Sequence, residues 1–237
     1  FVSFFCSYLI FSYILRIFIY RKIKLIYKTI SSSKNSKEKA LEKDVLKNII
    51  NKPLKVDLIK PVVNILRKNN IRIHAFIVIG IPGETDEHRL ESLKMIQKIG
   101  FDWVHVSIAI PIAGSRLYEI CVKNNYIINS NMINYISSKA IIKAPGIDPE
   151  NIEKFAYYMN LSINFVNNYN IINGNYNKVT GLLKNVVNKY PTHAFAHYFF
   201  AKICDDIELK NKHFEIFNNI IKTDEKWKNY AEQFNLI

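Results

Sequence analysis

Two short turns hold the residues whose types and spacing could do binding chemistry. The first turn reads Gly-Ile-Pro-Gly-Glu-Thr from residue 80, and the second reads Pro-Ile-Ala-Gly-Ser from residue 111. A glycine lets a ligand approach the main chain, and a carboxylate or hydroxyl at a helix start can accept hydrogen bonds from free amides. The same residues would also suit a tight turn and a helix cap that serve no ligand. The candidate ligand-binding residues are Gly80, Pro82, Gly83, Glu84, Pro111, Gly114 and Ser115.

Four histidines are the next candidates for catalysis or metal binding. His193 and His197 stand four positions apart on a predicted helix, a spacing that places two metal ligands on one face, but the pattern offers no acidic third ligand nearby. His74 and His105 fall within predicted strands, where a packed core or helix-facing histidine is the expected role. We therefore predict no metal ligand, and the sequence assigns no catalytic residue.

A strand, a helix and a second strand must position the two turns. Residues 71–79 are dense in β-branched and aromatic side chains, which predicts a strand buried on both faces. Residues 86–99 space their apolar side chains near 3.6 residues and end at Gly100, which predicts a helix. Residues 103–110 predict a second strand. Since the carboxyl ends of parallel strands form the ligand face of α/β sheets, we expect both turns at one rim.

The strings VIGIPGET and PIAGSRLYE resemble the second half of the barrel of radical S-adenosylmethionine enzymes, especially members that often carry a cobalamin-binding domain. The first string matches that family's Gly-x-Pro-Gly-Glu-Thr turn in full. The second string agrees at Pro111, Gly114, Leu117 and Tyr118, and it departs at Ala113 and Ser115, where the family has proline and threonine. The resemblance covers residues 44–125 and implies that both turns lie beside the adenosine part of bound S-adenosylmethionine.

The resemblance also implies a [4Fe-4S] cluster, and it leaves cobalamin open as a further cofactor. Such a cluster needs thiolate ligands at short spacing, which the family supplies in a Cys-x-x-x-Cys-x-x-Cys loop. Here Cys6, Cys121 and Cys204 stand far apart, and Leu-Glu-Lys-Asp replaces the family's Glu-Ser-Gly turn before Val45. We therefore expect either the C-terminal portion of a longer enzyme or a degenerate relative that cannot do the chemistry.

The start of the chain leaves three alternatives open. Residues 1–28 form a hydrophobic N-terminal segment, and residues 29–39 form a polar linker rich in serine and lysine. Within residues 1–24, an apolar run is interrupted by Arg16 and followed by basic residues. It could be a marginal membrane anchor, a buried element that completes a core, or non-native sequence at a fragment edge. The expected location is cytoplasmic, with membrane association as an alternative.

The rest of the chain predicts an α/β fold followed by helices. Residues 40–125 are predicted as a partial TIM-type (β/α) barrel with parallel strands, and residues 126–147 as a connector. Residues 148–237 begin with a helix-start signal, Asp-Pro-Glu, and show a period of roughly 34 residues, the length of tetratricopeptide repeats. We therefore expect an all-helical, tetratricopeptide-like domain there, although a plain helical bundle would bury the same aromatic residues.

Composition and charge limit the classes of function that this sequence favours. The formal net charge of +13 comes mostly from lysine, without an arginine-rich helix or an aromatic RNA-binding signature, so we expect a diffusely basic surface and no specific nucleic-acid site. The favoured function is the C-terminal portion of a radical S-adenosylmethionine iron-sulfur enzyme. The alternatives are a non-catalytic helical-repeat module that binds a protein partner through the C-terminal helices, and a basic membrane-peripheral protein.

Overall fold

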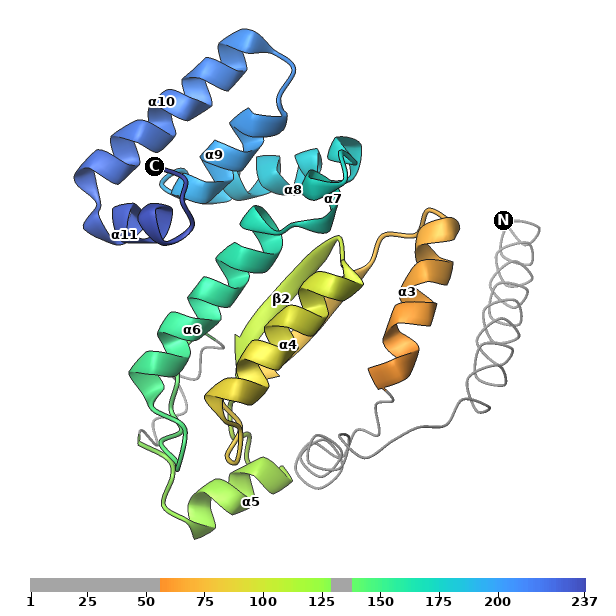
Figure 1. Cartoon of the computed structure of the whole chain (residues 1–237). Coiled ribbons are helices and arrows are strands. Elements are labelled where there is room, and N and C mark those ends of the chain that lie inside the picture. The colour runs from red at the N-terminus through yellow and green to blue at the C-terminus, as the bar shows by residue number, and fades with distance from the viewer. Residues whose placement is uncertain (1–55, 129–137) are drawn as a thin grey trace, which may run out of the picture. The chain divides into compact units, whose positions relative to one another are not determined.

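The computed structural model describes residues 56–128 and 138–237, and the statements below refer to these residues (Figure 1). The chain divides into two compact units, Phe1–Asn64 and Ile65–Ile237. The predicted hydrophobic segment 1–28 and linker 29–39 lie outside the described residues, as does the candidate membrane contact at residues 1–24. None of the described helices combines the length and the apolar character that a membrane span requires.

A short helical entry leads from the first unit to the second. A 3-10 turn, η2 (Val56–Leu58), precedes helix α3 (Ile59–Lys68). Pro61 falls in the first turn of α3, where a missing backbone N–H removes no helical hydrogen bond. Asn70 then takes a left-handed conformation with φ of 54°, and the chain turns towards the sheet.

The described part of the sheet has two parallel strands joined by one helix. Strand β1 (His74–Ile79) pairs with β2 (Trp103–Ile108), and helix α4 (Asp86–Ile99) connects them. Thr85 caps α4 through a capping box, and Gly100 ends it in a left-handed conformation. The predicted strand, helix and strand are therefore confirmed, and the parallel α/β character with them. A closed or partial barrel stays a prediction.

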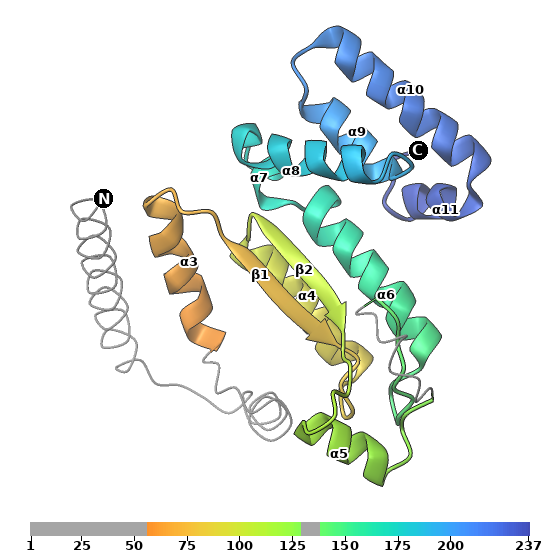
Figure 2. The ribbon, with the colours of Figure 1, turned by 180° about the vertical axis from the view of Figure 1, so that it is seen from behind.

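The two faces of this sheet differ. Helices α4 and α6 (Pro149–Leu161) lie on one side of the strands, and Figure 2 shows the other side from behind. On that other side Phe76 is 77% exposed and Val78 is 46% exposed. The prediction that residues 71–79 are buried on both faces is therefore wrong for the described structure. Their apolar composition suits two covered faces, but the described residues supply a helical layer for only one.

The outer edge of β2 is closed by a single side chain. Asn164 lies in a π-helical turn, η4 (Ser162–Val166), and it is fully buried. The amide nitrogen of Val104 donates to Asn164 Oδ1 at 2.8 Å, and Asn164 Nδ2 donates to the carbonyl oxygen of Val104 at 2.7 Å. These two bonds replace the pair that a neighbouring strand would make. Strand β1 has no such partner along its outer edge among the described residues.

The start of β2 is tied to the same helical segment by a buried polar group. Asp102 is 4% exposed, and its carboxylate accepts from the amide nitrogen of Ile73 at 2.6 Å and from Asn170 Nδ2 at 2.7 Å. Asn168 Nδ2 donates to the carbonyl oxygen of Asp102 at 3.3 Å. The helical segment after α6 therefore supplies the polar partners that the edge of the sheet needs.

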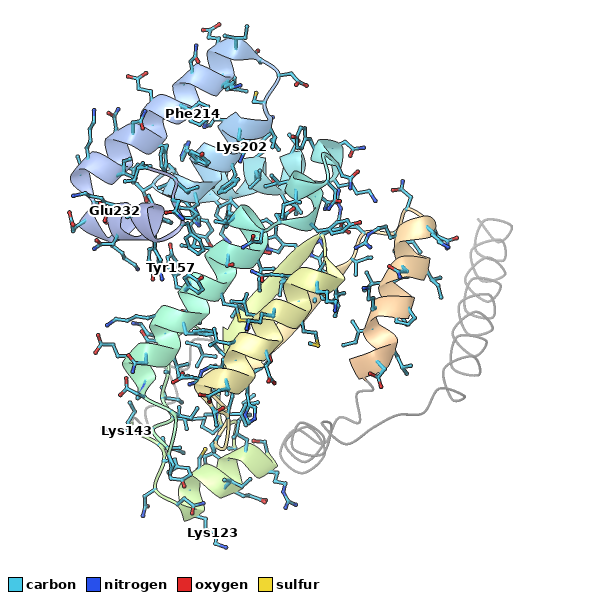
Figure 3. The ribbon with its side chains drawn as sticks, viewed as in Figure 1. Lys123, Lys143, Tyr157, Lys202, Phe214 and Glu232 are labelled. Carbon is cyan, nitrogen blue, oxygen red and sulfur yellow. The ribbon has the colours of Figure 1, made fainter. Side chains whose placement is uncertain are left out.

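The C-terminal stretch is helical, as predicted. Helix α6 begins at Pro149, and Asp148 caps it by accepting from the amide nitrogen of Asn151. Helix α9 lies between α8 and α10, and aromatic side chains fill the core around it (Figure 3). The remaining helices are α7 (Tyr169–Ile172), α8 (Tyr176–Lys189), α9 (Ala194–Ile203), α10 (Ile207–Thr223) and α11 (Glu225–Gln233). Their tetratricopeptide-like character stays a prediction.

Replacing Asn164 by alanine should strongly destabilise the protein. The change removes two hydrogen bonds and leaves the buried N–H and C=O of Val104 unpaired, which predicts a loss of about 2–5 kcal/mol in the free energy of unfolding. Urea unfolding followed by circular dichroism measures that loss. The matched control is Asn173→Ala, because the exposed Asn173 bonds only the carbonyl oxygen of Tyr169. A similar loss in both variants would contradict the role given to Asn164.

Candidate functional site

The two predicted turns leave the sheet at the same edge. Strands β1 and β2 are parallel and in register up to Ile79 and Ile108, and the amide nitrogen of Ala109 donates to the carbonyl oxygen of Ile79 at 2.8 Å. The first turn leads into α4, and the second leads into α5 (Arg116–Lys123). Figure 2 shows both strand arrowheads pointing towards the end where α5 lies. The expected common edge is confirmed, and ligand binding there stays a prediction.

The glycines of these turns play two different parts. Gly83 has φ of +91° and Gly114 has φ of +83°, and a side chain added to either would meet nothing within 4 Å. Gly80 has φ of +81°, but a Cβ there would lie 3.1 Å from a methyl carbon of Ile152 in α6. Gly80 is therefore needed for packing and for its backbone angle, whereas Gly83 and Gly114 face open space.

Glu84 closes the first turn from the inside. Its Oε2 accepts from the amide nitrogen of Gly80 at 2.6 Å and from Arg89 Nη1 at 3.4 Å. The side chain is 13% exposed, and burial raises the pKa of this carboxyl, while the Gly80 amide and Arg89 act in the opposite direction. One oxygen of the predicted binding carboxylate is therefore engaged within the turn.

Arg89 is a structural residue of this turn that sequence reasoning missed. It is 3% exposed, and it bonds Glu84, Asp86 and the carbonyl oxygen of Gly146. Its Nε is buried without a partner among the described residues. The signal lay in its spacing, because Arg89 occupies the same helix face as Leu93 and places a cation where the pattern calls for an apolar side chain.

The second turn is built around a serine cap. Ser115 Oγ accepts from the amide nitrogen of Tyr118 at 3.2 Å, and this bond starts α5. Pro111 is buried at the base of the turn, as Pro82 is in the first turn. Ile112 is 64% exposed beside these groups in the chain. The rim therefore offers two open glycine backbones and the apolar side chain of Ile112. The hydroxyl oxygen of Ser115 is engaged in the helix cap.

The histidines lie away from this edge or on the open face of the sheet. His74 and His105 are exposed, and the His105 ring stacks on Phe76 with ring centroids 4.5 Å apart. The prediction that these two are core or helix-facing histidines is therefore wrong. Strand alternation gives the period of two along each strand, but it could not tell which face the described helices cover.

His193 and His197 do not converge on a shared point. His193 Nδ1 accepts from the amide nitrogen of Ala196 at 3.1 Å as the cap of α9, while the nitrogens of His197 face Pro191 and His213. Within residues 56–128 and 138–237, no cluster of three or more His, Cys, Asp or Glu side chains could hold a metal ion.

The described cysteines do not form a cluster-binding set. Cys121 is fully buried in α5, where burial raises the pKa of its thiol, and Cys204 follows the end of α9. A cluster needs several thiolates at short spacing. These residues therefore do not fit the iron-sulfur group that the sequence resemblance implies.

Comparison with known proteins gives relatives that are methyltransferases. The chain is 29% identical over 128 residues to cytidylyl-2-hydroxyethylphosphonate methyltransferase of Streptomyces wedmorensis. This alignment covers 51% of the chain and 24% of that protein. It is also 31% identical over 84 residues to an uncharacterized methyltransferase of Pyrococcus horikoshii. That alignment covers 35% of the chain and 18% of the relative. The matched region thus spans a quarter or less of each relative. No family model matches the chain.

Replacing Arg89 by methionine should destabilise the first turn at neutral pH. The change leaves the buried Glu84 carboxylate without its cation, which predicts a loss of about 3–5 kcal/mol in the free energy of unfolding at pH 7. The loss should shrink at pH 4, because the raised pKa of Glu84 means that the folded state then holds this carboxyl neutral. Chemical unfolding at both pH values measures it.

Two controls test this explanation. The double variant Glu84→Gln with Arg89→Met should recover part of the loss, because an amide can accept from Gly80 without a neighbouring cation. Lys154→Met breaks an exposed pair with Glu150 and should change the free energy of unfolding by less than about 1 kcal/mol. If Arg89→Met behaves like Lys154→Met, the buried pair has no structural importance.

Proposed function

We propose that this chain is the part of an S-adenosylmethionine-dependent methyltransferase that holds the adenosine end of the cofactor. The observation that carries the proposal is the pair of open glycine turns at one edge of a parallel sheet, in a chain similar to two methyltransferases. Ligands of open α/β sheets bind at the carboxyl ends of the strands.

The rim suits a nucleoside for physical reasons. Backbone groups at Gly83 and Gly114 are accessible because neither position has a neighbouring atom where a side chain would stand. They could exchange hydrogen bonds with ribose hydroxyls or with the edge of a base. Ile112, 64% exposed in the second turn, offers an apolar surface for the face of a purine. Pro82 and Pro111 stiffen the turns, so little conformational freedom is lost on binding.

Glu84 and Ser115 would act here by holding the turns in shape. Glu84 fixes the Gly80 amide, and Ser115 fixes the start of α5. A bound S-adenosylmethionine would supply a methyl group or, with a cluster, an adenosyl radical. We assign no catalytic role to any residue of the described ranges 56–128 and 138–237.

More specifically, we propose that the chain belongs to the radical S-adenosylmethionine enzymes. The match of residues 80–85 to that family's turn supports it, and so does the form of the sheet. The outer edge of β2 is closed by Asn164, while the edge of β1 and the face around Phe76 have no partner among the described residues. Further parallel strands beside β1 would extend the sheet into a partial TIM-type barrel. The cluster and cobalamin remain predictions from the resemblance.

Binding of radiolabelled S-adenosylmethionine, measured by equilibrium dialysis against the full-length gene product, tests the proposal. Gly83→Ala and Gly114→Ala should each weaken binding by about tenfold or more, because a new methyl group stands between the ligand and the main chain. The matched control is Gly174→Ala, since Gly174 also has a positive φ of +70° and nothing within 4 Å, but it lies between α7 and α8.

Three results would count against the proposal. Absence of cofactor binding would favour the alternative, a non-catalytic interaction module on an α/β scaffold. Equal weakening by all three glycine variants would indicate a general loss of stability. Unchanged binding in both rim variants would place the cofactor elsewhere in the protein.

A further inference from the structure

Two histidines form a bridge between helices α9 and α10. His197 is 4% exposed in α9, and its Nδ1 lies 2.7 Å from Nδ1 of His213 in α10. The other ring nitrogen of His197, Nε2, lies 2.9 Å from the carbonyl oxygen of Pro191. The His213 ring also packs against Phe200 in a T-shaped arrangement, with ring centroids 4.8 Å apart. Both nitrogens of His197 are therefore engaged inside the protein.

These contacts fix which nitrogens carry hydrogen. A carbonyl oxygen can only accept, so Nε2 of His197 must carry the hydrogen that it donates to Pro191. Nδ1 of a neutral His197 is then an acceptor, and Nδ1 of His213 must donate to it. This leaves Nε2 of His213 as the one nitrogen that can take up a proton without breaking a bond of the bridge.

The surroundings oppose a second proton. Burial lowers the pKa of both rings. A positive charge on one ring also makes it harder to protonate the other, because the two like charges would repel. The titratable or charged groups that interact with the bridge are His193, at the start of α9, and Lys212, next to His213 in α10. In the described part of the chain, no carboxylate from α8, α10 or the turn at Pro191 bonds either ring.

We propose that the His197–His213 bridge is a proton-operated joint that holds α10 against α9 and releases it in acid. With both rings neutral, or with His213 alone charged, every hydrogen bond of the bridge can form. With both rings charged, Nδ1 of His197 also carries hydrogen, and two donors with like charge face each other at 2.7 Å. Release of the joint would expose aromatic side chains that α9 and α10 bury between them, among them Phe200 and Phe217.

The arrangement of hydrogens can be measured directly. Long-range proton–nitrogen NMR spectra of the wild-type chain at pH 7.5 should show hydrogen on Nε2 of His197 and on Nδ1 of His213. The second of these is the diagnostic signal, because a free imidazole favours hydrogen on Nε2. On acidification, His213 should titrate before His197. Hydrogen on Nε2 in both neutral rings, or both rings charging together without loss of the bridge, would overturn the proposal.

Hydrogen exchange tests the release. Protection of the α10 amides, corrected for intrinsic exchange rates, should stay nearly constant from pH 7.5 down to about pH 6.5, the ordinary pKa of a released histidine. Below that pH it should fall by up to about tenfold per pH unit for each proton that the closed joint excludes. His213→Gln should reduce this pH dependence, because an uncharged glutamine amide can donate to neutral His197 or accept from charged His197, so protonation of His197 no longer opposes the contact. His88→Gln is the matched control, since it removes a histidine from the distant cap of α4, where glutamine also fits a capping box.

The effect of His193 on the pH dependence must be distinguished from that of the bridge. Burial lowers the pKa of this ring to about 4, so it too resists protonation. The comparison is therefore repeated with His193→Asn in every variant, since asparagine keeps a side-chain cap at the start of α9. An α10 pH dependence that His213→Gln leaves unchanged in this background would show that the bridge does not control release. This outcome is independent of cofactor binding at the rim.

Discussion

The two hydrogen bonds between Asn164 and Val104 are the interaction on which the rest of the structure depends. A strand edge buried under helices would otherwise carry an unpaired amide and an unpaired carbonyl, and each would cost about 1–3 kcal/mol. The side chain of Asn164 satisfies both groups from within a π-helical turn, so α6 can pack beside β2. The helical C-terminal stretch is thereby attached to the sheet by direct pairing with its backbone.

The first glycine turn shows how one short stretch can serve packing and accessibility together. Gly80, Glu84 and Arg89 face inward: Gly80 packs against Ile152 of α6, and the Glu84 carboxylate bonds the Gly80 amide and the buried Arg89. Gly83 faces outward with no neighbour. The inward residues fix the backbone, and the outward residue keeps it accessible. The helix cap expected at this turn is supplied by Thr85, whereas Glu84 bonds the Gly80 amide and Arg89 instead. Neither role accounts for the open position at Gly83.

Local patterns predicted the elements well and the long-range contacts poorly. The spacing of apolar residues and the stop at Gly100 identified α4, and the β-branched runs identified both strands, because these signals are carried by near neighbours in the chain. Asn164 gave no such signal, since its partner Val104 is 60 residues away. The common edge of the two turns could be predicted from parallel pairing alone, whereas the inward direction of Glu84 depends on Arg89, which in turn bonds the distant carbonyl oxygen of Gly146.

The side of the sheet that the described helices leave uncovered affects the tendency of this polypeptide to associate with other chains. Among residues 56–128 and 138–237, the outer edge of β1 has no pairing partner and stands next to a phenylalanine that is 77% exposed. Such an edge is a template on which other extended chains can pair. Such edges promote aggregation unless another layer shields them. Within the part of the chain that the structure describes, the site that most favours such pairing is therefore β1, while the C-terminal helices bury their apolar side chains in a common core.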